Sequence, residues 1–294
     1  MMKEFIKYIY NIKVDNYTVN NDNYYIKSGQ KDYMFIPFYG NLINLYKKYI
    51  ILKKNGMCCH DIVFNRNNKI VSNYNNKQYI LLKKNININN PIEIGDLYNP
   101  IPIINCDEYI DIKNKWQIKN DYYESILEKI CSKNIELVLY FDYYLGLGEL
   151  AINLLNYINF SKIPLYAQHK RLKYNNSISD YYDPIDMIVD SKIRDISFYI
   201  KTIFFDNVIA IEGIKKFITR LVLSDDEAIM FFARMVYPDY YFDICDEILN
   251  KNVNNIKLEK CIKKNIQYEI FLKDIYQYLY NIYNIPNIEW FSIK

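Results

Sequence analysis

The residues with the greatest capacity for chemistry in this chain lie within residues 164–201. His169 leads a turn-rich polar loop, a short apolar segment follows, and Arg194 and Asp195 open a predicted helix. Loops of this layout hold a hydroxyl group and a divalent cation through carboxylate and amide oxygens, which is the chemistry of phosphoryl transfer. That chemistry needs a carboxylate just after the histidine to accept the hydroxyl proton. The chain has Arg171 at this place.

The loop resembles the motif H-G-D-x-x-x-x-N of phosphotransferases of the aminoglycoside and choline kinase type. In that motif the aspartate accepts the proton of the attacking hydroxyl, and the asparagine holds a metal ion. His169 matches the histidine and Asn176 matches the asparagine, whereas Lys170 replaces the glycine and Arg171 replaces the aspartate. The resemblance implies a remnant nucleotide site that has lost its proton acceptor.

The resemblance also implies a later aspartate that binds the metal ion on the ATP phosphates. Asp186 and Asp190 both follow apolar residues, and both remain candidates for this role, with Asp190 preferred as the inward carboxylate. Asp195 matches a further aspartate that opens the next helix and fixes the loop by hydrogen bonds. An aspartate at a helix start also caps the helix and interacts with its dipole. We therefore assign Arg194 and Asp195 structural roles.

Other parts of an ATP site are missing from the sequence. Arginine stays protonated because its pKa exceeds about 12, so Arg171 cannot accept a proton and would repel magnesium. A kinase also pairs a strand lysine with a helix glutamate. The strand 33–38 has Pro37 where that lysine is expected, and the helix 41–54 contains no acid. Gly29 stands alone, so no glycine-rich phosphate loop precedes the strand.

The elements that position these residues fall into two halves. Residues 1–84 predict a small β-rich N-lobe, residues 85–106 a proline-containing hinge, and residues 107–294 a large helical C-lobe. The spacing of apolar residues predicts strands at 23–27, 33–38, 62–64, 70–72 and 79–82, and a helix over 41–54 that Gly56 ends. This α+β pattern favours a two-lobed, protein-kinase-like fold.

In the C-lobe the sequence predicts helices over 120–132, 136–156, 194–205, 208–222, 225–236 and 257–283, the last of them broken. Ser224 and Glu227 form a capping box before the helix 225–236. Gly146 and Gly148 allow close helix contact. Arg234 lies among apolar residues, and we expect it to be partly buried and paired with an acid such as Asp243.

Composition excludes several classes of function. The formal net charge of +3 over 294 residues is small and no basic stripe is visible, so nucleic-acid binding is not expected. No apolar run is long enough to span a bilayer, and the N-terminus lacks a signal-peptide core, so a cytoplasmic location is expected. Cys58, Cys59 and His60 have no second ligand cluster, and we expect no metal site there.

Several landmarks resemble one family, the spore-coat-associated kinase-like proteins of endospore-forming Firmicutes (CotS/YutH type). They are Trp116 with Asp121-Tyr122-Tyr123-Glu124, the helix from Asp142 to Ile152, His169-Lys170-Arg171, Asp183-Pro184-Ile185-Asp186, Asp190, Arg194-Asp195, and the segment from Phe232 to Asp243. The resemblance implies the fold of the aminoglycoside phosphotransferases and choline kinases. It also implies a role in or near the spore coat, and hence a protein partner from the coat or its morphogenetic machinery.

The sequence therefore predicts a degenerate kinase-like protein, a pseudokinase, that acts as a binding or scaffold component in spore coat assembly. No cofactor is expected, and ATP and magnesium enter only if activity is retained. One alternative is an active small-molecule phosphotransferase that uses Asp186 or Asp190 as its base. Another is an unrelated α+β interaction protein. Asp142 and Glu149 share one helix face, which could line a cleft or face solvent.

Overall fold

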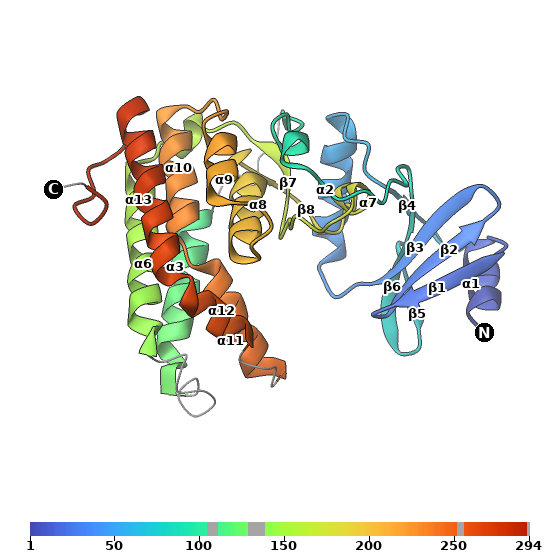
Figure 1. The fold of residues 1–294 in the computed structure, drawn as a ribbon. Coiled ribbons are helices and arrows are strands. Elements are labelled where there is room, and N and C mark those ends of the chain that lie inside the picture. Colours follow the sequence, from blue (N-terminus) through green and yellow to red (C-terminus); the bar gives the residue numbers. More distant parts are fainter. Residues whose placement is uncertain (105–110, 129–138, 252–255, 293–294) are drawn as a thin grey trace. The chain divides into compact units, whose positions relative to one another are not determined.

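The computed structural model describes residues 1–104, 111–128, 139–251 and 256–292 (Figure 1). The chain forms two compact units. The first comprises Met1–Glu93, Ile101–Cys106 and Asn175–Ile188, and the second comprises Ile94–Pro100, Asp107–Tyr174 and Val189–Lys294. The first unit is built on an antiparallel sheet and the second is mainly helical, as the α+β, kinase-like prediction requires.

The first unit consists of α1 (Met2–Tyr10), β1 (Asn16–Asn20), β2 (Asn23–Ser28), β3 (Lys31–Pro37), α2 (Leu42–Lys54), β4 (Asp61–Val63), β5 (Val71–Tyr74), β6 (Lys77–Lys83) and α7 (Ile178–Tyr181). The strands run in the order β1-β2-β3-β6-β4, and β5 also pairs with β6. Two-residue turns, Asn21-Asp22 and Asn75-Asn76, connect β1 to β2 and β5 to β6. All four turn residues have positive φ, the conformation that type I′ hairpin turns require and that asparagine tolerates.

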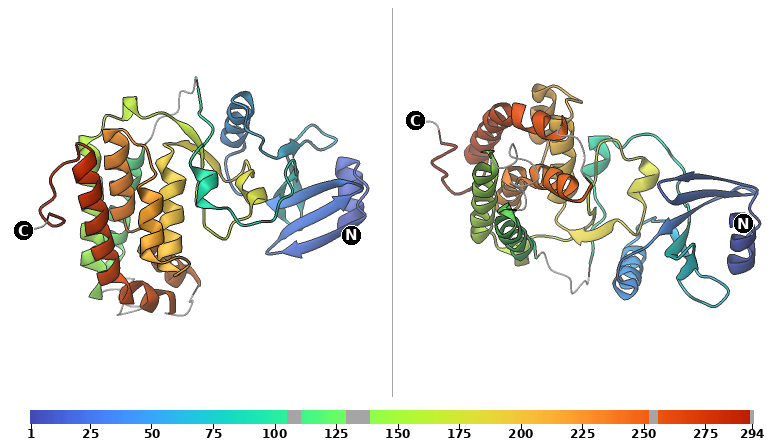
Figure 2. Two further views of the ribbon diagram at one scale, coloured as in Figure 1. Left: turned by 45° about the horizontal axis from the view of Figure 1, so that its top comes forward. Right: turned by 90° about the horizontal axis from the view of Figure 1, so that it is seen from below.

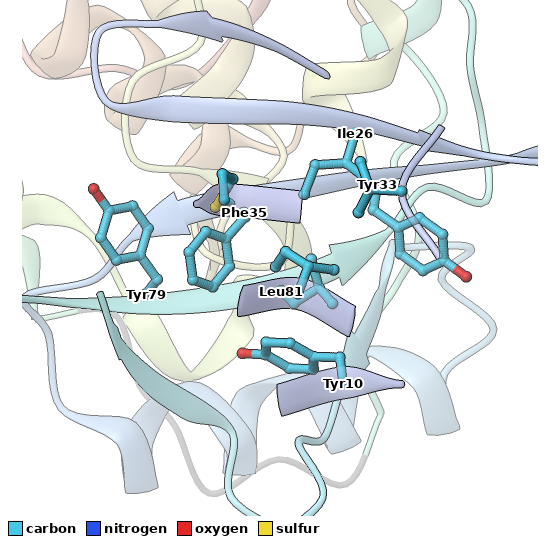
Figure 3. Packing of buried hydrophobic residues seen from close by; sticks show 9 residues of the cluster. Tyr10, Ile26, Tyr33, Phe35, Tyr79 and Leu81 are labelled. Atoms are coloured by element: carbon cyan, nitrogen blue, oxygen red, sulfur yellow. The ribbon is translucent and has the colours of Figure 1, made fainter. Parts of the chain in front are cut away.

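Each face of this sheet is covered by a helix. Because side chains alternate along a strand, Phe35 and Met34 of β3 point to opposite faces. On one face Ile26, Tyr33, Phe35, Tyr79 and Leu81 pack with residues of α1 that include Tyr10 (Figure 3). On the other face Met34, Ile62, Ile80 and Leu82 pack with Leu45 of α2. The sheet is therefore apolar on both sides.

The predicted strands of the first unit are confirmed as β2 to β6, and the helix over 41–54 is confirmed as α2. Asn41 caps α2 through its side chain, which accepts a hydrogen bond from the Asn44 N–H, and Gly56 has a φ of 84° just after the helix. Helix α1 and strand β1 were not predicted from the sequence. Every residue of β1 is exposed, so this strand lacks the apolar alternation on which the other strands were recognised.

The second unit contains η1 (Ile94–Leu97), α3 (Ile112–Ser125), α6 (Phe141–Leu154), η2 (Leu155–Tyr157), η3 (Phe160–Lys162), β7 (Tyr166–His169), α8 (Ile193–Phe205), α9 (Ile211–Ile218), α10 (Asp225–Val236), α11 (Asp239–Lys251), α12 (Ile256–Lys263) and α13 (Asn265–Ile282). Helix α10 contacts α6, α8 and α13 (Figure 2). All its residues from Glu227 to Val236 are buried, as expected for a helix at the centre of a core. Strand β8 (Met187–Asp190) pairs with β7.

Most predicted helices of the second unit are confirmed. The break in 257–283 separates α12 from α13, and the Ser224–Glu227 capping box forms with both of its hydrogen bonds. The predicted helices 120–132 and 136–156 correspond to α3 and α6, and residues 129–132 and 136–138 lie outside the described residues. Helix α11 was not predicted. No helix within the described ranges combines the length and apolarity needed to cross a bilayer.

Gly148 permits a close contact between α6 and α3, and Gly146 does not. A Cβ added at Gly148 would lie 2.5 Å from Nδ2 and 2.7 Å from Oδ1 of the buried Asn120, whereas a Cβ at Gly146 would meet no atom within 4 Å. Alanine at position 146 should stabilise the protein by up to about 1 kcal/mol through helix propensity. Alanine at position 148 should instead destabilise it by about 1–3 kcal/mol through overpacking. Urea unfolding of the two variants measures this difference, and equal effects would contradict the close contact.

Candidate functional site

His169 is fixed by Asp195 at the start of α8. The backbone N–H of His169 donates to Oδ1 of Asp195 over 2.9 Å, and Nδ1 of the imidazole lies 2.6 Å from Oδ2. The N–H of Asp195 in turn donates to Oε1 of Gln168. These three side chains are all buried. Both carboxylate oxygens of Asp195 are thus used to hold the end of β7 against α8.

Asp190, at the end of β8, is held between two guanidinium groups. Nη1 of Arg194 lies 2.9 Å from Oδ2, and Nη2 of Arg234 lies 2.7 Å from Oδ1. Oδ1 also accepts the N–H of Ser191. Burial raises the pKa of Asp190, but the charges of Arg234 and Arg194 outweigh it and hold the pKa below its usual value. Asp190 is therefore a charged and fully paired carboxylate.

Arg194 also holds the backbone of the loop. Its Nε donates to the carbonyl of His169 over 2.7 Å, and its Nη2 donates to the carbonyl of Lys170 over 3.0 Å. One guanidinium thus joins β7, the start of the loop and Asp190, using the fork of donors that only arginine has. Arg234 is buried and paired with an acid, as expected, but the acid is Asp190 and not Asp243. Arg234 is only 4% exposed and pairs with Asp190, because α10 runs through the core beside α8.

Arg171, in place of the catalytic aspartate, is directed toward α11. Its Nη2 donates to Oδ1 of Asp243 over 2.8 Å, and its Nη1 lies 3.9 Å from Oδ2 of Asp239. The guanidinium carbon lies 4.8 Å from the centre of the Phe198 ring. The side chain keeps 40% of its surface exposed. Arg171 therefore forms an ion pair and a cation–π contact within the second unit.

Phe198 is surrounded by three cations, Arg171, Arg194 and Lys201, at 4.8, 5.4 and 5.4 Å from its ring centre. The Lys201 ammonium is buried and donates to the carbonyls of Arg234 and Tyr237 and to Oδ2 of Asp239. Burial lowers the pKa of Lys201, and the charge of Asp239 opposes this effect. Sequence reasoning did not single out Phe198, Lys201 or Asp239. The spacing of 194, 198 and 201 along one helix face was the available signal.

A cavity of about 170 Å³ opens beside Arg171. Phe198, Lys201, Tyr240 and Asp243 contribute to its wall, together with Glu247. Two ion pairs lie in this wall, with Lys257 2.6 Å from Glu247 and Lys201 2.7 Å from Asp239. The cavity is thus lined by these ion pairs and by the aromatic side chains of Phe198 and Tyr240.

Within the described residues of the first unit, no lysine–glutamate pair joins β3 to α2. Met34 of β3 and Leu45 of α2 belong to one apolar cluster. Lys53, in the last turn of α2, instead pairs with Asp61 of β4 over 2.7 Å. Pro37 ends β3. The face of the sheet that a kinase uses to hold phosphates through such a pair is here a hydrophobic core.

The other predicted site residues belong to different surroundings. Asn176 and Asp186 lie in the first unit, where the Asn176 carbonyl accepts the N–H of Ile92 and Asp186 is exposed. Asp142 and Glu149 of α6 are both exposed. The structure therefore brings together His169, Arg171, Asp190, Arg194 and Asp195 in the second unit.

These residues do not fit a magnesium–nucleotide complex. The two oxygens of Asp190 have about four acceptor sites, and three of these accept hydrogen bonds from Arg194, Arg234 and the N–H of Ser191. The two guanidinium charges would also oppose a divalent cation at this position. Among the described residues no group of three or more His, Cys, Asp or Glu side chains could hold a metal ion.

Solved structures define the class of fold. An aminoglycoside phosphotransferase from Alicyclobacillus acidocaldarius subsp. acidocaldarius DSM 446 has a TM-score of 0.61 at 10% identity, covering 92% of this chain and 93% of that chain. Amicoumacin kinase hAmiN in complex with AMP-PNP, Ca²⁺ and Ami has a TM-score of 0.52 at 12% identity, covering 95% and 93%. The AMP-bound spectinomycin phosphotransferase APH(9)-Ia has a TM-score of 0.52 at 13% identity, covering 94% of each chain. The protein thus has the aminoglycoside phosphotransferase fold.

The chain belongs to the family described as spore coat putative kinase YutH, whose sequence model matches residues 3–275. No curated protein matches the sequence with significance. The family and the fold class expected from the loop and its landmarks are both confirmed.

Proposed function

We propose that this protein is a pseudokinase that serves as a binding or scaffold component in spore coat assembly. The observation that carries the proposal is the state of Asp190, whose two oxygens are each bound by an arginine. The positive charges of these arginines oppose the binding of a divalent cation at Asp190. The family's description as a spore coat protein supports the place of action, and a protein of the coat is the proposed partner.

Two further features support the loss of catalysis. Arg171 cannot act as a general base, and it stands at the position of the loop where the catalytic aspartate is expected. Its guanidinium pairs with Asp243 and Asp239. The apolar contact between β3 and α2 supplies no charge for the phosphates of ATP. Three separate requirements of phosphoryl transfer are therefore unmet.

Calorimetric titration of the full chain with ATP, with and without Mg²⁺, tests the proposal. We expect no magnesium-dependent binding, which corresponds to a dissociation constant weaker than about 1 mM. Tight binding that needs Mg²⁺ and is lost in Asp186→Ala or Asp190→Ala would contradict the pseudokinase assignment and favour an active phosphotransferase. Circular dichroism establishes that each variant is folded under the conditions of the titration.

The scaffold part of the proposal has its own test. A fluorescent fusion of the intact chain, expressed in the sporulating host, should collect at the surface of the developing spore. A signal that stays evenly spread through the mother cell during coat formation would contradict a role in the coat.

A further inference from the structure

The outer edge of β1 is an unprotected sheet edge. In the described part of the chain β1 has one strand neighbour, β2, and all five of its residues are exposed. Its sequence, Asn16-Tyr17-Thr18-Val19-Asn20, contains no charged residue and no proline. Natural proteins commonly protect such edges with charges, prolines or bulges. At the opposite end of the sheet β4 does carry a charge, Asp61, which pairs with Lys53.

The register of the hairpin determines which backbone groups of β1 face outward. Asn20 pairs with Asn23 across a two-residue turn, and such a turn is closed by a hydrogen-bonded pair. Hydrogen-bonded and non-hydrogen-bonded pairs then alternate along the ladder. Tyr17 and Val19, opposite Ile26 and Tyr24, are non-hydrogen-bonded positions. Their N–H and C=O groups therefore point away from β2.

The sequence of β1 is nearly symmetric about Thr18, and this symmetry selects the partner. When two copies align antiparallel about a two-fold axis at Thr18, Asn16 lies opposite Asn20, Tyr17 opposite Val19, and Thr18 opposite itself. The outward backbone groups of Tyr17 and Val19 then meet as hydrogen-bonded pairs. Tyr–Val and Thr–Thr are favourable cross-strand pairs. The edge is therefore complementary to itself.

The side chains at this edge favour the same arrangement. Tyr17 is 38% and Val19 is 53% exposed. Both lie on the face of the sheet that α1 covers, because their partners on β2, Ile26 and Tyr24, belong to the hydrophobic cluster with α1. Pairing two copies would place Tyr17 of each chain against Val19 of the other and extend that apolar layer across both sheets.

We propose that β1 pairs antiparallel with β1 of a second copy of this chain, with the two-fold axis at Thr18, to join the two sheets into one. The contact is isologous, as two-fold interfaces are, and it uses the strand-addition mode of recognition. Since a single short strand buries little area, the association is expected to be weak and to require high local protein concentration.

Disulfide trapping with Thr18→Cys tests this register, in a Cys58→Ser background because Cys58 is exposed. A non-hydrogen-bonded pair places its Cα atoms about 4.5 Å apart, which a disulfide can bridge. The matched control is Asn20→Cys on the same strand, whose two copies would lie about 13 Å apart in this register at 3.3 Å per residue. We expect the Thr18→Cys chain to form disulfide-linked dimers, mapped by mass spectrometry, at least about tenfold faster than the Asn20→Cys chain.

A second substitution distinguishes cross-linking through paired β1 strands from cross-linking through random collisions between chains. Val19→Lys, added to the Thr18→Cys chain, should reduce cross-linking to the rate of the Asn20→Cys control, because it places a charge on the apolar face of the edge. Val208→Lys, at an exposed position of the second unit, should leave the rate unchanged. Equal rates for Thr18→Cys and Asn20→Cys, or no effect of Val19→Lys, would overturn the proposal. Equal rates would mean that the edge stays free or takes a different strand.

Discussion

Asp190→Ala is expected to lower the free energy of unfolding by about 3–5 kcal/mol, the cost of breaking a buried ion pair from one side. The substitution leaves Arg194 and Arg234 without the carboxylate that both contact at 2.7–2.9 Å. It also removes the acceptor of the Ser191 N–H. The two tryptophans, Trp116 and Trp290, both lie in the second unit, so their fluorescence during urea unfolding reports on the unit that contains Asp190.

The matched control for this prediction is Asp186→Ala. Asp186 was the other candidate for the metal-binding carboxylate, and it is exposed. Its removal should lower the free energy of unfolding by less than that of Asp190, because the interactions of an exposed carboxylate are weakened by solvent. If the role of Asp190 were only to bind a metal ion, its removal would not lower the free energy of unfolding, because its charge would be unfavourable in the absence of the ion. If Asp190→Ala were neutral or stabilising, or if Mg²⁺ stabilised only the unsubstituted chain, the double arginine pair would not be the main role of Asp190.

The positions of the candidate site residues along the chain could be predicted from the sequence, but their side-chain partners could not. His169, Asp190 and Asp195 were found because the order of strand, loop and helix fixes their positions along the chain. The partner of Arg234 could not be found in this way. Asp190 and Arg234 are 44 residues apart, and their pairing depends on the packing of α10 against α8 in the core. A local pattern carries no information on such a contact.

The same difference between local pattern and tertiary packing explains which elements were not predicted from the sequence. Strands β2 to β6 have an apolar side and were predicted, whereas β1 is exposed along its whole length and was not. Helix α11 follows Pro238 and opens with a run of aromatic residues that does not by itself predict a helix. Tyr241 and Phe242 are buried, but their helical spacing is visible only when the segment is read on to Lys251.

Arg171 and Asp190 both form ion pairs within the second unit. Arg171 faces acids of α11, and Asp190 faces arginines of α8 and α10. The counter-charges of Arg171 and Asp190 are therefore side chains of the protein itself. In a kinase the residues at such positions interact with the substrate and the metal ion. We infer that these pairs stabilise the second unit in the absence of a ligand, which is a property that a scaffold requires.

His60 provides a second large expected effect, on the pH dependence of the first unit. Its side chain is fully buried. The N–H of Asn85 donates to Nδ1 over 3.2 Å, so the proton lies on Nε2, which donates to the carbonyl of Ser179 over 3.0 Å. Burial, with a smaller contribution from the charge of Lys84, lowers the pKa of His60 from 6.5 to about 4. The folded protein therefore favours the neutral imidazole of His60 over the protonated one.

Because the pKa is lower in the folded protein, the unfolded chain binds more protons between pH 6.5 and 4. The free energy of unfolding therefore rises with pH across this interval. The stability conferred by neutral His60 should be complete above pH 6.5 and decline as the pH falls toward 4, by about 3 kcal/mol in all, since one pKa unit corresponds to about 1.4 kcal/mol. Urea unfolding followed by circular dichroism at a series of pH values measures this slope.

His60→Gln assigns the slope to this residue. Glutamine can still donate to the Ser179 carbonyl but does not titrate, so the variant should show a flatter dependence between pH 6.5 and 4. The chain has one other histidine, His169, and His169→Gln serves as the control because it lies in the second unit. If the slope persists in His60→Gln and disappears in His169→Gln, the imidazole beside Asp195, and not the one bound to Ser179, determines the acid sensitivity of the fold.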